Sequence, residues 1–222
     1  MSTDHTPLLE AARNGNADDV RRFLPLCDPK HNHSEALCAA AENGHAECVA
    51  LLIAVSDPKA NCNYPLRLAC MNNRVECVRL LLPVSDPKED SGLALQQCVT
   101  HQHPECIKLL IPFNTNSHNG LALQAAARAG YTQGLSMLIP VTHLEARTQA
   151  LVTAVGLGHL DCVDLLYPVA DPLSALVHIQ KFYPQSHQHR QTLERMIAQK
   201  QNDTLCAALG NGIGHKGSVR KM

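Results

Sequence analysis

One sequence pattern recurs along this chain at a nearly fixed interval. Six similar segments, such as ECVALLIAVSDPK and ECVRLLLPVSDPK, begin at Asp18, Glu47, Glu76, Glu105, Gln133 and Asp161. The interval is 29 residues for the first three steps and 28 for the last two. A fixed period in this range is typical of a solenoid, in which each repeat packs only against its neighbours. The repeat therefore predicts one elongated domain and not a single globular core.

Each repeat carries signals for two antiparallel helices, which we expect to be shorter than three turns. In the second repeat, an alanine-rich first helix over residues 36–42 precedes Asn43-Gly44. Glycine readily adopts the left-handed conformation that ends a helix. The second helix follows at once, and proline cannot continue it. The second helices are therefore expected to end near Pro25, Pro83, Pro112, Pro140 and Pro168.

The apolar runs of the second helices, such as VRLLL, have no partner within their own repeat. They are expected to pack against the adjacent repeats, because no single repeat can bury them. On this prediction Leu80 lies in an interface between repeats. Its replacement by Asp would then destabilise the stack, whereas the same change at Lys88 would leave stability nearly unchanged.

The first halves of the repeats also align, and here a family pattern is visible. Thr6-Pro7-Leu8, Ala11-Ala12, Gly15 and Val20 resemble the ankyrin pattern T-P-L-x-x-A-A-x-x-G-x-x-x-x-V. Gly44-His45 with Glu47 and Val49, and Gly158-His159 with Asp161 and Val163, resemble its G-H-x-acid-x-V segment. The resemblance covers roughly residues 6–172. It implies an all-α, ankyrin-repeat solenoid of about six repeats, of the stand-alone type found in bacteria or large viruses.

The sequence departs from that pattern in repeat length and in one glycine. Ankyrin repeats are typically about 33 residues long, and the missing residues lie between repeats, so shortened finger loops are expected. The fourth repeat has Gln102 where most of the others have glycine. We predict a repeat array over residues 1–172, a degenerate repeat and helical cap over 173–209, and a flexible tail over 210–222. In the cap, Leu193, Met196 and Ile197 form the apolar stripe of an amphipathic helix.

Charge and composition exclude several functional classes. The formal net charge of −1 gives no general attraction to nucleic acids or membranes. No apolar run approaches the about 20 residues of a membrane span, and no secretory signal peptide is recognisable. The absence of Trp and the few Tyr and Phe residues argue against a base-stacking surface. We expect the protein to be cytoplasmic in the cell that synthesises it and monomeric when it is free. Delivery into a host cell is the alternative.

Ten cysteines and thirteen histidines raise the question whether the chain has a catalytic or metal-binding site. Cys48, Cys77, Cys106 and Cys162 occupy the same place in four repeats and are expected to be buried, free thiols. No Cys-x-x-Cys spacing supports zinc. No nucleophile, base and orienting residue stand at a recognisable spacing. We therefore predict no catalytic site, no metal and no cofactor, with an enzyme built on a Cys/His site as a less favoured alternative.

The candidate partner-binding residues are of two kinds. Residues just before the turn between the two helices vary from repeat to repeat: Arg13, Asn14, Glu42, Asn43, Met71, Asn72, Thr100, His101, Arg128 and Ala129. The finger loops add Lys30, Lys59 and Lys88 from the recurring Asp-Pro-Lys units, in which Asp-Pro is good turn chemistry. Variation on a constant scaffold is what a specific binding surface would show.

The resemblance implies a module that binds other proteins through its concave face and finger loops. Within that class we expect one of two roles. The first is an effector that acts on host proteins. The second is an inhibitor, immunity partner or accessory subunit that binds an enzyme or toxin in its own cell.

Overall fold

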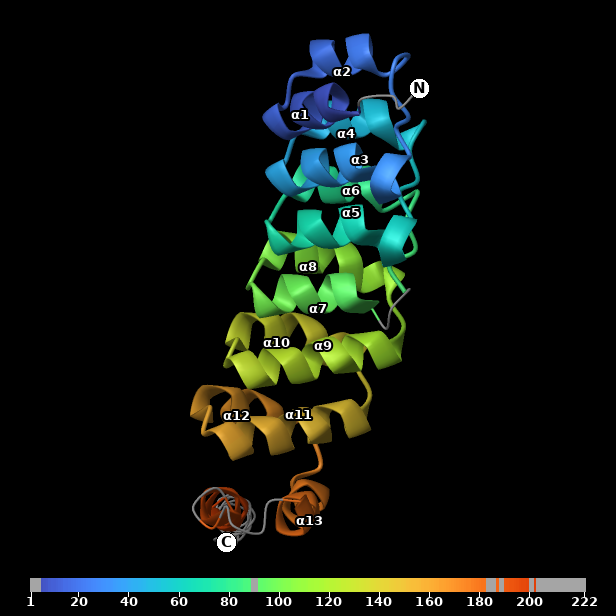
Figure 1. Ribbon diagram of the computed structural model, residues 1–222. Coiled ribbons are helices and arrows are strands. Elements are labelled where there is room, and N and C mark those ends of the chain that lie inside the picture. Colours follow the sequence, from blue (N-terminus) through green and yellow to red (C-terminus); the bar gives the residue numbers. More distant parts are fainter. Residues whose placement is uncertain (1–4, 89–91, 183–186, 188–189, 200–201, 203–222) are drawn as a thin grey trace, which may run out of the picture.

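The computed structural model describes residues 5–88, 92–182, 187, 190–199 and 202. Pairs of antiparallel helices stack in one column from the N-terminal to the C-terminal end (Figure 1). The first helices are α1 (Thr6–Asn14), α3 (His31–Asn43), α5 (Ala60–Met71), α7 (Leu93–Thr100), α9 (Asn116–Ala129) and α11 (Leu144–Leu157). The second helices are α2 (Ala17–Phe23), α4 (Ala46–Ile53), α6 (Val75–Leu81), α8 (Pro104–Leu110), α10 (Thr132–Leu138) and α12 (Leu160–Leu166). The described residues contain no strand, and the predicted all-α solenoid is confirmed.

A single core runs along the whole stack, between the two rows of helices. First helices pack on first helices and second helices on second helices. Each first helix contributes one fully buried leucine at the same place, namely Leu8, Leu37, Leu66, Leu95, Leu123 and Leu151. Each second helix contributes a fully buried aliphatic residue, namely Val20, Val49, Val78, Ile107, Leu135 and Val163. The core therefore repeats with the sequence, because each repeat buries its apolar residues against the next.

The turns between the paired helices have the expected left-handed residue. Gly44 ends α3 with φ 85°, and Gly130 and Gly158 end α9 and α11 in the same way. Where glycine is missing, the backbone keeps this conformation: Asn73 has φ 55° and Gln102 has φ 58°. The prolines follow as predicted, since α6 ends at Leu81 and Pro83 lies just beyond it.

The loops between repeats change their structure with the repeat length. In the longer repeats, three residues near the start of the first helix form a left-handed turn. In α3 these are Asn32, His33 and Ser34, with φ of 46°, 57° and 62°, and the regular right-handed helix begins after them. Residues 61–63 repeat this turn. In the shorter repeats, α9 and α11 begin immediately after Thr115 and His143 and run for 14 residues. The expectation that every helix has fewer than three turns was wrong for these two, because the loss of one residue lets the helix include the finger segment.

Two more helical segments follow the sixth pair. α13 (Pro172–Phe182) packs on α11, and residues 190–199 are helical as well. Leu193 is fully buried, whereas Met196 and Ile197 are half-buried against the core. This arrangement covers the apolar surface that the sixth repeat would otherwise expose. The domain boundaries stay predictions, and residues 203–222, which include the expected tail, lie outside the described residues.

The predicted burial of Leu80 is wrong. Its side chain is 37% exposed on the outer side of α6, and the residues that face the neighbouring repeats are Cys77, Val78 and Leu81. Three consecutive leucines occupy positions 80–82, and a helix turns by about 100° per residue, so they cannot all face one side. The interface position is therefore Leu81.

Asp171 gives a prediction about the C-terminal end of the stack. Its carboxylate accepts hydrogen bonds from the backbone N–H of Leu173 (3.1 Å) and Ser174 (3.2 Å) in the first turn of α13. The hydrogen bonds from the Ser174 side chain and backbone lower the pKa of Asp171. A lowered carboxyl pKa stabilises the fold above the ordinary pKa and ceases to do so as the pH falls through the folded-state value. We expect Asp171→Ala to lower the melting temperature by a few degrees at neutral pH, and the difference to vanish in melts at acidic pH.

Candidate partner-binding face

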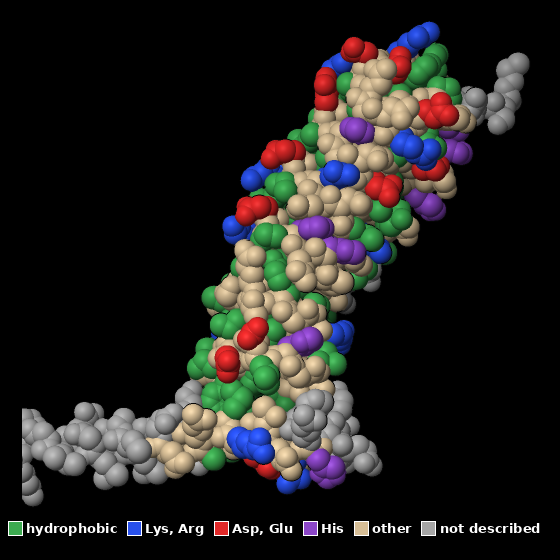
Figure 2. Space-filling view, turned by 90° about the vertical axis from the view of Figure 1, so that its left-hand side faces the viewer, with side chains coloured by type: hydrophobic (Ala, Val, Ile, Leu, Met, Phe, Trp, Pro, Cys, Tyr) green, Lys and Arg blue, Asp and Glu red, His purple; other side chains and the backbone are tan. Residues whose placement is uncertain are grey.

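The second helices form one outer face of the stack, and several of its basic side chains are paired with acidic ones. Arg79 lies 3.4 Å from Glu76 and Lys108 lies 2.8 Å from Glu105, each within one turn of its helix. Figure 2 shows acidic and basic side chains alternating down the left side of the upper half of the stack. We call this side the second-helix face. Such exposed pairs stabilise the fold little, but they leave few unpartnered charges for a ligand.

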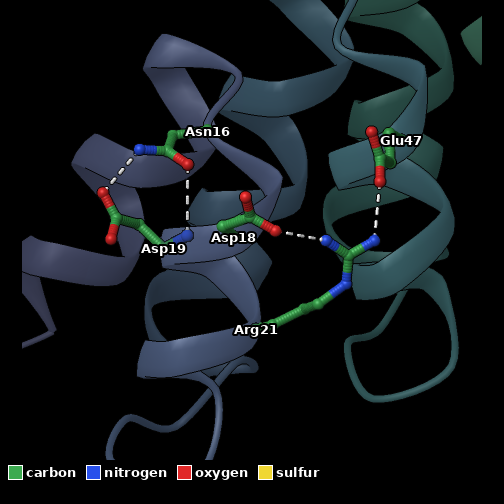
Figure 3. A network of polar contacts seen from close by, with 5 residues as sticks. All are labelled: Asn16, Asp18, Asp19, Arg21 and Glu47. Atoms are coloured by element: carbon green, nitrogen blue, oxygen red, sulfur yellow. Dashed lines mark hydrogen bonds and ion pairs between the residues drawn. The ribbon is translucent and has the colours of Figure 1, made fainter.

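The same face begins with a polar network at the N-terminal end (Figure 3). Arg21 donates to Asp18 at 2.8 Å and to Glu47 of the next repeat at 2.6 Å. Asn16 caps α2 by accepting the backbone N–H of Asp19 at 3.2 Å. The network gives the first repeat the polar outer side that a terminal repeat needs in water.

The opposite face is built by the first helices and is called the first-helix face below. Of the turn-edge residues predicted to bind a partner, Met71 is half-buried. The others are exposed: Arg13, Asn14, Glu42, Asn43, Asn72, Thr100, His101, Arg128 and Ala129. Within the described residues, Arg13, Glu42 and Arg128 have no ion-pair partner. The charged groups of this edge are thus available to a partner, in contrast to those of the second-helix face.

The backbone beneath these residues is held by the turn of the following repeat. The Nε2 atom of His45 lies 3.0 Å from the carbonyl oxygen of Arg13, and that of His103 lies 3.0 Å from the carbonyl oxygen of Met71. His159 makes the same contact with Arg128 at 3.1 Å. His45 and His159 of the Gly-His pattern therefore have a structural role. These contacts fix the turn edge, so that its side chains project from a rigid support.

Arg74 replaces histidine at this position in the third repeat. Its Nε atom donates to the carbonyl oxygen of Glu42 at 2.9 Å. The arginine side chain therefore bonds a backbone carbonyl of the preceding repeat, as the imidazole does in the other repeats. The sequence pattern alone did not assign this role to Arg74.

The three finger lysines are exposed and share one local structure. Asp28, Asp57 and Asp86 accept the backbone N–H of the lysine two residues later, at 2.9, 3.0 and 3.1 Å. The predicted turn role of the Asp-Pro-Lys units is confirmed. Lys30, Lys59 and Lys88 have no ion-pair partner among the described residues. They project from one edge of the stack, one lysine per repeat.

Three fingers are held by a polar side chain at or near the start of the first helix of the preceding helix pair. The backbone N–H of Asp57 donates to Ser34 at 2.9 Å, that of Asp86 to Asn63 at 2.9 Å, and that of Asp171 to Thr148 at 3.1 Å. We call such a contact a finger rung. Gly92 and Gly120 occupy the rung position in the fourth and fifth repeats and offer no side chain for it. The spacing between two fingers is therefore less constrained there.

The predicted residue Met71 belongs to a stripe on α5 whose other members, Tyr64 and Arg67, were not predicted from the sequence. Tyr64, Arg67 and Met71 lie three, four and seven residues apart, so that they share one side of the helix. Tyr64 is 36% exposed, Arg67 and Met71 are half-buried, and the Arg67 guanidinium lies 5.6 Å from the Tyr64 ring centre. Tyr64 occupies the first aligned position of its repeat, and that position varies from Thr6 to Glu35, Leu93 and Leu121. This variation was a signal that could have identified it.

The thiols of the four aligned cysteines are buried in the stack. Cys48, Cys77, Cys106 and Cys162 are buried and free, as predicted. Burial raises the pKa of Cys38 to about 12 and that of Cys77 to about 11, because a thiolate would lose its hydration. A hydrogen bond with Cys98 lowers the pKa of Cys106, whose side chain has no access to solvent. In the described part of the chain, no three His, Cys, Asp or Glu side chains converge as metal ligands would.

The paired helices, left-handed turns and stacked repeats together define an ankyrin-type solenoid. The family model for ankyrin repeats (3 copies) matches residues 8–91 and 68–148. The chain belongs to the ankyrin-repeat family, and ankyrin repeats are protein–protein interaction modules. No curated protein matches the chain.

Solved structures agree on the fold. The ankyrin repeat domain of Bcl-3, a member of the IkappaB protein family, superposes with a TM-score of 0.64 at 23% identity, over 77% of this chain and 89% of that one. The human ASB11 ankyrin repeat domain gives a TM-score of 0.64 at 19% identity, over 74% of this chain and 84% of that one. Within the residues that the structure describes, no helix is both long and apolar enough to cross a membrane.

Proposed function

We propose that this chain is a non-catalytic module that binds a partner protein through its first-helix face and finger edge. The observation that carries the proposal is the α5 stripe of Tyr64, Arg67 and Met71, which is only partly covered by the rest of the protein. Tyr, Arg and Met are enriched in protein interfaces, and Tyr and Arg are common energetic hot spots. A half-buried side chain has already lost part of its freedom, so its immobilisation by a partner costs less entropy.

The distribution of charge supports the same face. Arg21, Arg79 and Lys108 on the second-helix face are each paired with an acidic side chain. Arg13 and Glu42 on the first-helix edge have no such partner among the described residues. Charged groups without an internal partner contribute to the rate and specificity of association.

Affinity capture with the tagged chain tests the proposal and separates the two roles within it. Two baits, the parent protein and the double variant Tyr64→Ala/Met71→Ala, would each be incubated with lysate of its own cells and with lysate of a plausible eukaryotic host. We expect a protein that is retained by the parent and lost with the double variant. A partner from its own cells would support the inhibitor or accessory role, and a partner from the host lysate would support the effector role. A partner retained equally by both baits would contradict the proposed face.

A further inference from the structure

A recess lies on the first-helix face towards the C-terminal end of the stack. A pocket of about 290 Å³ opens between α9 and α11, and a second of about 220 Å³ lies between α11 and α13. Glu145 and Gln149 of α11 line both, so the two pockets are neighbours, and we call them together the α9–α13 recess. Its size approaches that of pockets that enclose one or two side chains of a ligand.

Two small residues shape the first pocket of the recess. Gly120 of α9 lines the first pocket, and a Cβ atom placed there would lie 3.0 Å from the Cβ atom of Ala146 on α11. Gly120 stands 28 residues before Thr148, which carries the finger rung to Asp171. A serine or threonine at position 120 would therefore fill the space and reach towards the next finger, as Ser34 and Thr148 do. The glycine leaves that space open.

The walls of the recess combine polar side chains, two exposed leucines and two carboxylates. Leu121, which is 39% exposed, lines the first pocket, and Leu144, which is 55% exposed, lines the second. Glu145 contributes a carboxylate to both pockets and Asp171 contributes one to the second. No lysine or arginine is among the residues that line either pocket. Glu145 is exposed and has no ion-pair partner among the described residues.

Side-chain amides complete the site. Gln124 and Gln149 line the first pocket, and each amide offers both hydrogen-bond donors and an acceptor. The Gln149 amide nitrogen lies 3.3 Å from Nδ1 of His178, which fixes its position. Amides of this kind can bond the main chain of a bound peptide regardless of its sequence.

We propose that the α9–α13 recess binds a cationic, apolar segment of a partner polypeptide, with an aliphatic side chain over Gly120 and a Lys or Arg against Glu145. This inference rests on the proposed function and adds the chemistry of the ligand. Charge complementarity selects this occupant, because the carboxylates of Glu145 and Asp171 line the pockets and no Lys or Arg does. The exposed leucines supply the apolar part of the contact.

The test uses the full chain and a displayed library of random short peptides. Selection on the parent is expected to enrich peptides that combine Lys or Arg with an aliphatic residue. A synthetic copy of an enriched peptide should bind about tenfold more weakly to Glu145→Gln and to Gly120→Ser, and more weakly in high salt. Asp164→Asn removes the same charge from the second-helix face and should leave the affinity unchanged.

The variants are chosen so that folding does not obscure the result. Glu145 is exposed, so Glu145→Gln is expected to melt as the parent does, and this variant decides the test if the short contact with Ala146 destabilises Gly120→Ser. Enrichment of acidic or uncharged peptides, failure to enrich any, or equal binding to parent and Glu145→Gln would overturn the inference. If the captured partner still depends on Tyr64 and Met71 while the recess variants bind as the parent does, the recess inference fails and the proposed function stands.

Discussion

Leu81→Asp is expected to unfold the middle of the stack, with a loss of about 5 kcal/mol in the free energy of unfolding. Leu81 is fully buried at the end of α6, where the second helices of adjacent repeats meet. The substitution removes a leucine from the core and puts a carboxylate in a place without water or a cationic partner. Urea unfolding followed by circular dichroism measures the effect.

The neighbouring residue provides a matched control. Leu80→Asp makes the same chemical change in the same helix, but Leu80 is 37% exposed. We expect it to change stability by less than about 1 kcal/mol, because exposed substitutions have small effects. Lys88→Asp, in a finger, should behave likewise. Equal unfolding curves for Leu81→Asp and the parent would show that the helices do not stack as described.

Two glycines should respond in opposite directions to the same substitution. Gly44 has φ 85°, and a Cβ atom there would lie 2.7 Å from Cδ of Arg74, whose Nε atom bonds Glu42. Gly156 lies in α11, and a Cβ atom there would meet nothing within 4 Å. We expect Gly44→Ala to cost about 2 kcal/mol, because a left-handed backbone is unfavourable for alanine. Gly156→Ala should gain about 1 kcal/mol.

Thermal melts of the two alanine variants beside the parent test this pair. A lower melting temperature for Gly44→Ala and a higher one for Gly156→Ala are expected. Two shifts of the same sign would contradict the assignment of the Asn43-Gly44 turn.

The period and the turn residues were enough to predict the fold. The intervals of 29 and 28 residues, with a helix-ending glycine and a later proline in most copies, implied the stack. The burial of Cys48, Cys77, Cys106 and Cys162 followed from the same alignment, since all four occupy the same position of the second helix. These features are local or strictly periodic, and so a single sequence shows them.

Other features depend on contacts between repeats, and the sequence could not show them. Periodicity did not separate Leu80 from Leu81, because both lie in an unbroken apolar run. The shorter interval was visible, but its conversion of a left-handed turn into the first turn of α9 was not. The α9–α13 recess depends on how closely Gly120 and Ala146 approach, which is a property of packing.

The candidate site was predicted in part. The turn-edge and finger residues are at the surface as expected, apart from the half-buried Met71, and their binding role stays a prediction. Tyr64 and Arg67 were not predicted, because they lie at the start and middle of α5, away from the turn between the helices. Their partial exposure depends on packing against the adjacent first helices, which the alignment of repeats does not give.

The central claim is that a partner protein contacts the first-helix face. The most direct measurement is calorimetric titration of the captured partner into the parent, into Tyr64→Ala/Met71→Ala, and into Arg79→Ala/Lys108→Ala on the second-helix face. All three proteins would first be shown to unfold at similar temperatures. The account predicts an affinity loss of about 100-fold for the first double variant, as expected for two hot-spot side chains, and almost none for the second. The reverse order, with binding lost only through Arg79 and Lys108, would contradict it.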